Sequence, residues 1–474
     1  MKRRNGQETD ITQLKIDWDK LSKEADGLLQ ELFPICRSIT GNGTRKTLEK
    51  LREIAQFDIK EIPSNTVCYD WAVPEEWNIV DAFIKDSKGN KIVDFSESNL
   101  HIVNYSVPID KIIPFCELEE HLHYLPELPN SIPYRTSYYH RDWGFCITYE
   151  QYQQLDKSGE YHVVIDSTHT EGVLTYGETR IEGETDREYL ISTYCCHPSL
   201  ANDNLSGQIL WALLIRELKS IKTRHSYRFV IVPESIGAIA YLCHNEESMK
   251  RIDGGFVLTT VAGPGGFGYK NTYLGNHLID RVVQRTFDEL NVSYIAYPFD
   301  IRGSDEKHYS APYFRIPVGT ISKDKYFEYD YYHTSLDNLD FVKSKNLIET
   351  LRLYLLAIEK LEINVIYENL NPYCGLMLRK RNLYPKIGGQ IVQKVADTKT
   401  SHLEREYKIS DNDSICGSEL DMIGWLMFCS DGHTSVLDIS EKTKHPMRSL
   451  FETARKLEAH GLLKELNYSG SEAI

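Results

Sequence analysis

A histidine and an aspartate lie six residues apart at a predicted strand-to-helix crossing. His197 and Asp203 follow the apolar run 188–194, and a helical pattern begins at 206. In an α/β sheet such a crossing lies at the edge where ligands bind. Histidine supplies a neutral nitrogen and aspartate a hard oxygen, and this pair of donors suits Zn²⁺. The residues alone leave open a second interpretation, in which the segment is a polar loop that caps the helix.

Two acidic residues further along the chain could act on a substrate held beside such a metal. Glu234 follows the apolar run 227–232, and a carboxylate there can deprotonate an attacking water and then protonate a leaving amine. It can equally be an acid stabilised by the dipole of the helix behind it. Asp305, in the segment 302–308, could orient a metal-ligating histidine or bind a substrate amine. In the same segment, His308 is more typical of an ordinary loop histidine.

A further histidine precedes the helical pattern that starts near 342. His333 has acidic neighbours in Asp337 and Asp340, and a histidine held by a carboxylate is typical of a zinc ligand. The two aspartates can equally cap the helix that follows. We therefore expect His333 to be a candidate ligand.

Strand and helix patterns alternate after about residue 160, which predicts the sheet that must position these side chains. Near-continuous apolar strands separated by helices indicate an α/β fold with a mixed, mainly parallel sheet covered by helices on both faces. The predicted strands are 161–165, 172–176, 189–192, 227–232, 255–260 and 316–321, and the predicted helices are 206–222, 235–246, 277–290 and 343–362.

Patterns on either side of this region predict three further parts. Residues 12–55 are helical apart from a Gly-Asn-Gly break, and short alternating runs from about 57 indicate a small antiparallel β module rich in aromatic residues. Residues 370–410 form a mixed connector. The element order of a winged helix follows, with helices at 419–429, 436–443 and 447–460, a turn at 430–432 and a strand at 461–466.

Composition limits the classes of protein to which this chain can belong. Its 474 residues suggest two or three domains, and 41% apolar and 26% charged residues are typical of a soluble globular protein. The net charge of −15 argues against a broad nucleic-acid surface. Ten cysteines without a CxxC pair indicate reduced thiols in a cytoplasmic protein. We find no signal sequence and no run of about 18 apolar residues, so we expect no membrane association.

The order of these side chains resembles that of the di-zinc aminopeptidase and glutaminyl cyclase superfamily, whose sheet carries ligands on consecutive strand-end loops. By that resemblance His197, Asp203 and His333 match metal ligands, with Asp203 at the bridging position. Glu234 matches the general base, and Asp305 matches the acid of a Ser-Asp element that precedes an Ile-Pro strand.

Two departures from this pattern bear on the number of metals. The superfamily commonly has a second acid directly after the base, where this chain has Ser235. It also has an aspartate at the end of the next strand, where this chain has Thr259 and Thr260. Each departure removes an oxygen ligand. Three protein ligands plus water is the ligand count of a mononuclear catalytic zinc, so we expect one Zn²⁺ rather than two.

The whole chain resembles still more closely a bacterial family of aminopeptidase-like proteins associated with polysaccharide biosynthesis. The stretches that carry this resemblance are DWAVPEEWN at 70–78, NLHIVNYS at 99–106 and IPYRTSYY at 132–139. The resemblance implies three domains: a zinc exopeptidase-like domain formed by 12–60 and 160–368, an inserted antiparallel β domain at 61–159, and a connector with a winged helix at 369–474.

The leading hypothesis is a zinc-dependent amide hydrolase of the aminopeptidase type, acting on a small peptide or on an aminoacyl or N-acyl substrate. Glu234 and Asp305 are then the catalytic candidates, and Tyr194 and Arg302 the candidate substrate contacts. One alternative is a metal-binding or regulatory protein whose peptidase site has decayed.

The predicted winged helix raises another alternative, binding to DNA. Its helix 447–460 mixes basic residues with Glu452 and Glu458, so contacts with protein are favoured over contacts with DNA. Assembly into a homo-oligomer is left open.

Overall fold

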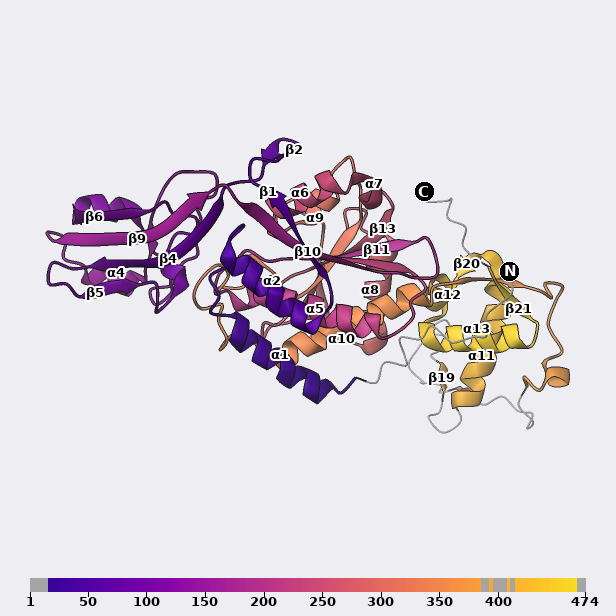
Figure 1. Ribbon diagram of the computed structural model, residues 1–474. Helices are drawn as coiled ribbons and strands as arrows, with labels where there is room; N and C mark the ends of the chain where they lie inside the picture. The colour runs from indigo at the N-terminus through magenta and orange to yellow at the C-terminus, as the bar shows by residue number, and fades with distance from the viewer. Residues whose placement is uncertain (1–15, 385–391, 395–406, 410–413, 467–474) are drawn as a thin grey trace. The chain divides into compact units, whose positions relative to one another are not determined.

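The computed structural model describes residues 16–384, 392–394, 407–409 and 414–466, in two compact units (Figure 1). Of the described residues, those in 16–287 and 291–356 form one unit, and those in 288–290 and from 357 onward form the other. The start of the predicted helical region, 12–15, and most of the predicted connector after 384 lie outside the described residues. Among the helices that are described, none is both long enough and apolar enough to cross a membrane.

The first unit is built on an eight-stranded mixed sheet, which confirms the predicted fold class. In spatial order its strands are β1 (Asp58–Pro63), β10 (Val173–Ile181), β12 (Ser226–Val232), β11 (Glu188–Tyr194), β13 (Ile252–Leu258), β16 (Val318–Lys323), β14 (Phe267–Lys270) and β15 (Tyr294–Tyr297). The four central strands, β12, β11, β13 and β16, are parallel neighbours. Antiparallel pairs join them to β10 on one side and to β14 on the other. The parallel centre places the carboxyl ends of β11, β12 and β13 at one edge.

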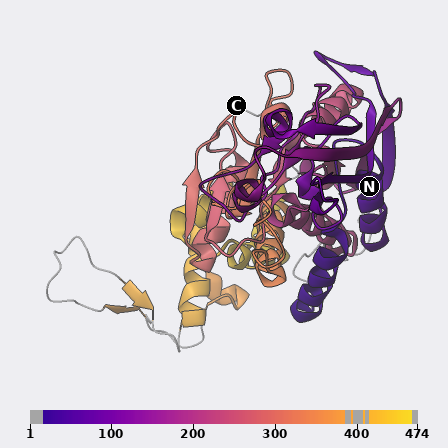
Figure 2. The same cartoon turned by 90° about the vertical axis from the view of Figure 1, so that its left-hand side faces the viewer.

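Helices cover both faces of this sheet (Figure 1). On one side lie α1 (Trp18–Leu32), α2 (Asn42–Ile54), α5 (Gly207–Lys219) and α10 (Ser344–Glu362), and on the other lie α6 (Ile236–His244), α7 (Glu246–Met249) and α9 (Glu306–Tyr309); α8 spans Leu278–Leu290. The two N-terminal helices, drawn in indigo, lie side by side in both views (Figures 1 and 2). In α1 the buried residues recur every three or four positions, as a helix with one covered face requires.

Between β1 and β10 the chain forms a separate four-stranded antiparallel sheet. Its strands, in spatial order, are β5 (Lys91–Asp94), β4 (Glu76–Lys85), β9 (Glu160–Thr170) and β6 (Ile109–Pro114). The strand predicted at 161–165 for the large sheet belongs to β9 and lies here instead, because β9 pairs along its length with β4 and β6. Conversely, the run predicted to open the β module is β1 of the large sheet.

Short elements complete this insert. They are β2 (Val67–Cys68), β3 (Trp71–Ala72), η2 (Asn99–His101), α3 (Phe115–Leu118), η3 (Glu119–His121), β7 (Leu122–His123), β8 (Phe145–Cys146) and α4 (Tyr149–Gln154). β2 and β3 form a small hairpin in which Cys68 is paired with Trp71.

The second unit contains helices and a three-stranded antiparallel sheet. Its helices are α11 (Ser414–Cys429), α12 (Val436–Thr443), α13 (Met447–Ala459) and the short η5 (Leu378–Arg381), and the sheet order is β20 (Asp431–Ser435), β17 (Ile366–Asn369) and β21 (Leu463–Leu466). The turn predicted at 430–432 is wrong in part, because Asp431 and Gly432 begin β20 and Asp431 is paired with Glu368 of β17. A further hairpin is formed by β18 (Val392–Lys394) and β19 (Tyr407–Ile409). The winged-helix interpretation of this unit stays a prediction.

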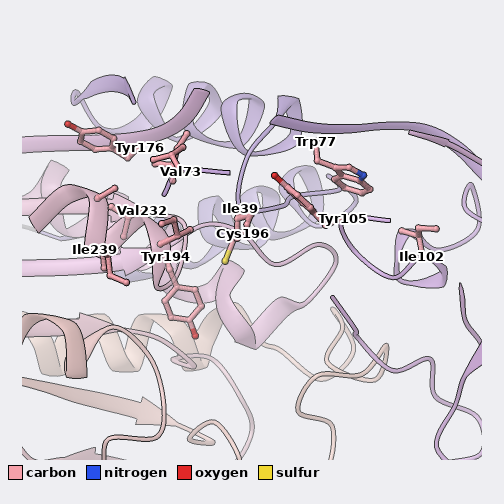
Figure 3. Packing of buried hydrophobic residues seen from close by; sticks show 14 of the residues in the cluster. Ile39, Val73, Trp77, Ile102, Tyr105, Tyr176, Tyr194, Cys196, Val232 and Ile239 are labelled. Atoms are coloured by element: carbon pink, nitrogen blue, oxygen red, sulfur yellow. The ribbon is translucent and has the colours of Figure 1, made fainter. Parts of the chain in front are cut away.

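A single hydrophobic cluster joins the insert to the large sheet (Figure 3). Trp77 and Tyr105 belong to the insert, and Tyr194, Cys196 and Val232 lie at or just beyond the ends of β11 and β12. All five are buried. Because close-packed interiors resist displacement, this cluster fixes the strand ends from which the predicted site residues project.

A buried carboxylate ties the insert to α2 and β10. Glu76 accepts hydrogen bonds from the Arg45 guanidinium, the Asn78 amide and the backbone N–H of Val173. The hydrogen bond from Arg45 contributes most to holding the pKa of Glu76 at about 2. We expect Glu76→Gln to lower the free energy of unfolding at pH 7 by about 2 kcal/mol. Since a lowered pKa stabilises only the ionised carboxylate, the difference should be full above pH 4.5 and shrink as the pH falls toward 2.

Urea unfolding of both proteins at a series of pH values measures this difference. Glu75→Gln is the matched control, because Glu75 pairs with Arg141, whose side chain is 61% exposed. An exposed pair contributes less than about 1 kcal/mol. Equal losses of stability in the two variants would contradict the prediction.

Candidate metal centre

The three predicted ligands meet at one point. A ring nitrogen of His197, a carboxylate oxygen of Asp203 and a ring nitrogen of His333 all lie within 4.8 Å of one another. The Nε2 atom of His333 is 2.9 Å from Asp203 Oδ2, and the Nε2 atom of His197 is 4.0 Å from the same oxygen. Two imidazole nitrogens and a carboxylate oxygen are donors that zinc accepts, so these residues fit the ion.

The backbone is unusual at two of the three ligands, Asp203 and His333. His197 follows the end of β11, and Asp203 lies in the π-helical turn η4 (Ala201–Ser206), where Asp203 and Asn204 depart from helical geometry. His333 has a φ of 57°, in the left-handed region that few side chains adopt. Such conformations persist only where the surrounding structure holds them. The supports of these ligands are therefore part of the site.

Burial and proximity set the protonation of the ligands. His197 is 4% exposed, and the loss of water around its ring lowers its pKa to about 4. It is therefore neutral at pH 7, as a metal ligand must be. Burial opposes ionisation of Asp203, but His197 and His333 beside it hold the pKa of that carboxyl at about 2. Asp203 thus carries a negative charge that favours a cation.

Glu234 lies beside this group, just beyond the end of β12. Its Oε2 atom is 3.8 Å from His197 Nε2, and 26% of its side chain is exposed. Burial, followed by the charges of Asp305 and Asp203, raises the pKa of Glu234 well above its ordinary value. A carboxyl group with a raised pKa holds a proton more readily, and its exposed fraction lets it exchange that proton with water.

Asp305 lies close to Glu234 but contacts the backbone. It is fully buried, and its Oδ1 accepts a hydrogen bond of 2.8 Å from the N–H of Ser235. Ser235 has a φ of 62°, so this bond holds a strained residue directly after Glu234. Burial raises the pKa of Asp305 to about 7. These contacts suit a residue that positions Glu234, and a direct catalytic role for Asp305 stays a prediction.

The two predicted substrate contacts lie in different surroundings. Tyr194 is 2% exposed, and its hydroxyl donates to Asp203 Oδ1 at 2.5 Å and lies 2.7 Å from Thr259 Oγ1. These contacts make it a buried support for a ligand instead of a surface for substrate. Arg302 is exposed, and its described hydrogen bonds use backbone atoms. No described contact brings its side chain to the ligand group.

Asp337 supports the backbone of the segment that carries Asp203, although its position in the sequence makes it a candidate helix cap. It is fully buried and does not cap the helix that follows it in the chain, because α10 begins only at Ser344. Its Oδ1 accepts the N–H of Asn202 at 2.6 Å, and its Oδ2 accepts the N–H of Asp203 at 2.9 Å. The Tyr329 hydroxyl donates to the same Oδ2 at 3.0 Å. Asp337 therefore holds the turn that carries a ligand.

We expect Asp337→Asn to weaken zinc binding by about 10- to 100-fold. An amide has one acceptor oxygen, so its NH₂ group would face one of the two N–H groups of the turn. Competition with a chelating dye measures the affinity. Asp340→Asn is the matched control, because Asp340 is exposed and nearby in sequence. The same affinity in both variants would show that the turn keeps its shape without this carboxylate.

A buried arginine holds the other ligand segment, and no sequence pattern had pointed to it. Arg37, in the loop between α1 and α2, is 0% exposed. Its Nε donates to the carbonyl of His197 at 2.7 Å, and its two terminal nitrogens donate to the carbonyls of Leu32 at 2.7 Å and Pro198 at 3.1 Å. The guanidinium thus fixes the backbone of His197 and Pro198 through their carbonyl groups.

The insert contributes an aromatic wall to the ligand group. Tyr134 is buried, and its ring centroid lies 5.2 Å from that of His197 and 5.1 Å from that of His333. The N–H of Tyr134 donates to the carbonyl of His333 at 2.8 Å, and Pro133 forms an antiparallel bridge with Thr334. The insert therefore holds the segment that carries His333.

Known proteins resemble this chain over most of its length. A family model described as a domain of unknown function, DUF4910, matches residues 27–364. A protein of Clostridium acetobutylicum named "putative polysaccharide biosynthesis protein with aminopeptidase-like domain" is 41% identical over 441 residues, which are 93% of this chain and 96% of that protein. A crystal structure of a "putative peptidase" from the same organism is 38% identical, with a TM-score of 0.86, and covers 96% of this chain and 100% of that one.

A more distant solved structure shares the fold. The zinc aminopeptidase BSAP from Bacillus subtilis is 14% identical with a TM-score of 0.53, and the match covers 74% of this chain and 96% of that one. The large mixed sheet with its covering helices is therefore aminopeptidase-like.

Proposed function

This chain belongs to the DUF4910 family, and on that premise we propose that it is a zinc-dependent amide hydrolase of the exopeptidase type. The observation that carries the proposal is the meeting of His197, Asp203 and His333 beside Glu234. As substrate we propose a small peptide or an aminoacyl or N-acyl compound; the aminopeptidase-like domain in the name of the Clostridium relative favours the peptide.

The chain's own residues have separate tasks in this reaction. A bound zinc ion acidifies water and polarises an amide carbonyl. Glu234, beside His197, would accept the proton of the attacking water and deliver it to the leaving nitrogen. Asp305 keeps Glu234 in place through the N–H of Ser235. The aromatic ring of Tyr134 excludes water from one side of the two histidines.

The surroundings of Asp203 support one zinc ion. Its Oδ2 faces the two histidines, whereas its Oδ1 accepts a hydrogen bond from the Tyr194 hydroxyl. Tyr194 in turn contacts Thr259, which stands where the superfamily pattern has an acid. The oxygen that would bridge to a second metal already has a hydrogen-bond donor, so we propose a mononuclear site.

Hydrolysis by the zinc-loaded, full-length protein tests this proposal. The substrates are a panel of aminoacyl and N-acyl amides, and product amine is measured. Removal of zinc with a chelator should abolish hydrolysis, and added zinc should restore it. The zinc content of His333→Ala should fall by about one ion per chain, because that variant lacks a ligand.

A second candidate is a metal-binding regulatory protein without catalytic activity. The observation that favours it is the absence of carboxylates at Ser235 and Thr259. About one zinc ion per chain with no hydrolysis of any substrate in the panel would support this candidate over the hydrolase.

For the second unit we propose contacts with protein in preference to DNA. In α13, the Nε of Arg448 donates to Glu359 at 2.5 Å, and Lys456 pairs with Glu419. Basic groups with carboxylate partners are poorly suited to neutralise phosphates. A gel-shift measurement with random DNA at low salt tests this, and a shift that weakens with added salt would contradict it.

A further inference from the structure

Two cysteines and a histidine from separate elements come together away from the ligands described above. The Sγ atoms of Cys68 and Cys243 and a ring nitrogen of His244 lie within 4.8 Å of one another. Cys68 stands on the β2–β3 hairpin of the insert, whereas Cys243 and His244 end α6. Figure 1 shows β2 beside α6, and residues of the two elements are in contact.

The hairpin is held in this position by other contacts. The hydroxyl of Tyr69, the residue after Cys68, donates to Glu246 Oε1 at 2.8 Å. The other oxygen of Glu246 accepts a hydrogen bond of 3.1 Å from Tyr313. Cys68 is fully buried, while Cys243 is half-buried, and both are free thiols. The two sulfur atoms are therefore placed together before any ligand arrives.

The histidine is prepared for metal binding. The Nδ1 atom of His244 lies 2.9 Å from the Ala240 carbonyl oxygen. Because a carbonyl only accepts, Nδ1 carries the ring hydrogen and donates it. That bond leaves the lone pair on Nε2, and a ring N–H bound to a carbonyl is the usual support of a ligating histidine. His244 also lies in the last turn of α6, where the helix dipole favours a cation.

We propose that Cys68, Cys243 and His244 form a second zinc site, which fastens the β2–β3 hairpin to the end of α6. Two thiolates and an imidazole are donors that zinc prefers, with bonds of about 2.3 Å to sulfur and about 2.0 Å to nitrogen. Zinc binding releases the two thiol protons, and water completes the coordination. This helix begins two residues after Glu234, so the ion secures the element that follows that residue.

A metal explains this arrangement better than a disulfide does. A disulfide would use only the two sulfur atoms and would leave the orientation of His244 without a role.

Zinc content measured on the full-length protein tests the proposal. After weakly bound metal is removed, the double variant Cys68→Ser/Cys243→Ser should retain one zinc ion per chain fewer than the wild type. The matched control is Cys116→Ser/Cys374→Ser, because both of these cysteines are free and exposed, and its zinc content should be unchanged. Since the result is a difference between proteins with the same His197 and His333, it does not depend on the proposed hydrolase site.

A second measurement needs no variant. In the native protein, added zinc should protect the half-buried thiol of Cys243 from alkylation, and peptide mapping should identify that residue. Cobalt in place of zinc should give a near-ultraviolet sulfur-to-metal band that the first double variant lacks. Equal zinc contents in all three proteins, or a disulfide between Cys68 and Cys243 in the purified wild type, would overturn the proposal.

Discussion

Glu234→Gln should lower kcat by about 10²- to 10⁴-fold while the protein still binds zinc. Glutamine has nearly the same size as glutamate but cannot accept the proton of an attacking water. The three proposed ligands, His197, Asp203 and His333, are unchanged in this variant, so metal binding should persist. The kinetics are measured with the best substrate of the amide panel, and zinc is counted in the same preparation.

Glu247→Gln is the matched control for this variant, because 88% of the Glu247 side chain is exposed. It should hydrolyse the substrate at the wild-type rate. Full activity in Glu234→Gln with zinc bound would show that another group takes the proton. Loss of zinc from the variant would instead show that Glu234 is a metal ligand. The measurement of zinc is needed because Glu234 Oε2 lies only 3.8 Å from His197 Nε2.

Arg37→Met should lower the free energy of unfolding by about 3 kcal/mol and should weaken zinc binding. Methionine fills part of the space but donates no hydrogen bond, so the carbonyls of Leu32, His197 and Pro198 lose a donor. Each buried acceptor left without a partner costs about 1–3 kcal/mol, and removal of a buried charge offsets part of that cost. Urea unfolding measures the first effect, and chelator competition measures the second.

Arg52→Met provides the comparison, because Arg52 is exposed at the end of α2. A surface substitution of this kind should change stability by less than about 0.5 kcal/mol. If Arg37→Met unfolds at the same urea concentration as Arg52→Met, the three hydrogen bonds of Arg37 contribute nothing net to stability.

Periodic patterns in the sequence predict the elements that carry the site. The helix predicted at 206–222 is α5, and the strand predicted at 227–232 is β12, because both are mostly apolar and bounded by polar turns. The order of His197, Asp203 and His333 along the chain predicts that they converge, since strand-end loops of a parallel sheet share one edge.

The supports of these side chains could not be predicted in the same way. Arg37 binds three backbone carbonyls, and a carbonyl partner leaves no mark on the sequence. The position of Asp337, four residues after His333, did indicate a carboxylate that could support the histidine. An acid before a helix is equally typical of a helix cap, so the sequence could not decide between the two. The prediction that 161–165 belongs to the large sheet is wrong, because strand pairing depends on distant partners, here β4, which local alternation does not identify.

The bridge between Pro133 and Thr334 has a consequence for how this protein could be shortened or recombined. The N–H of Tyr134 and the carbonyl of His333 are joined across it, so the loop that presents one ligand takes its shape from the insert. Excision of 61–159 would leave that loop without its partner strand. The insert is therefore not a detachable module, and a chimera that grafts this metal centre onto another aminopeptidase-like fold must carry both segments together.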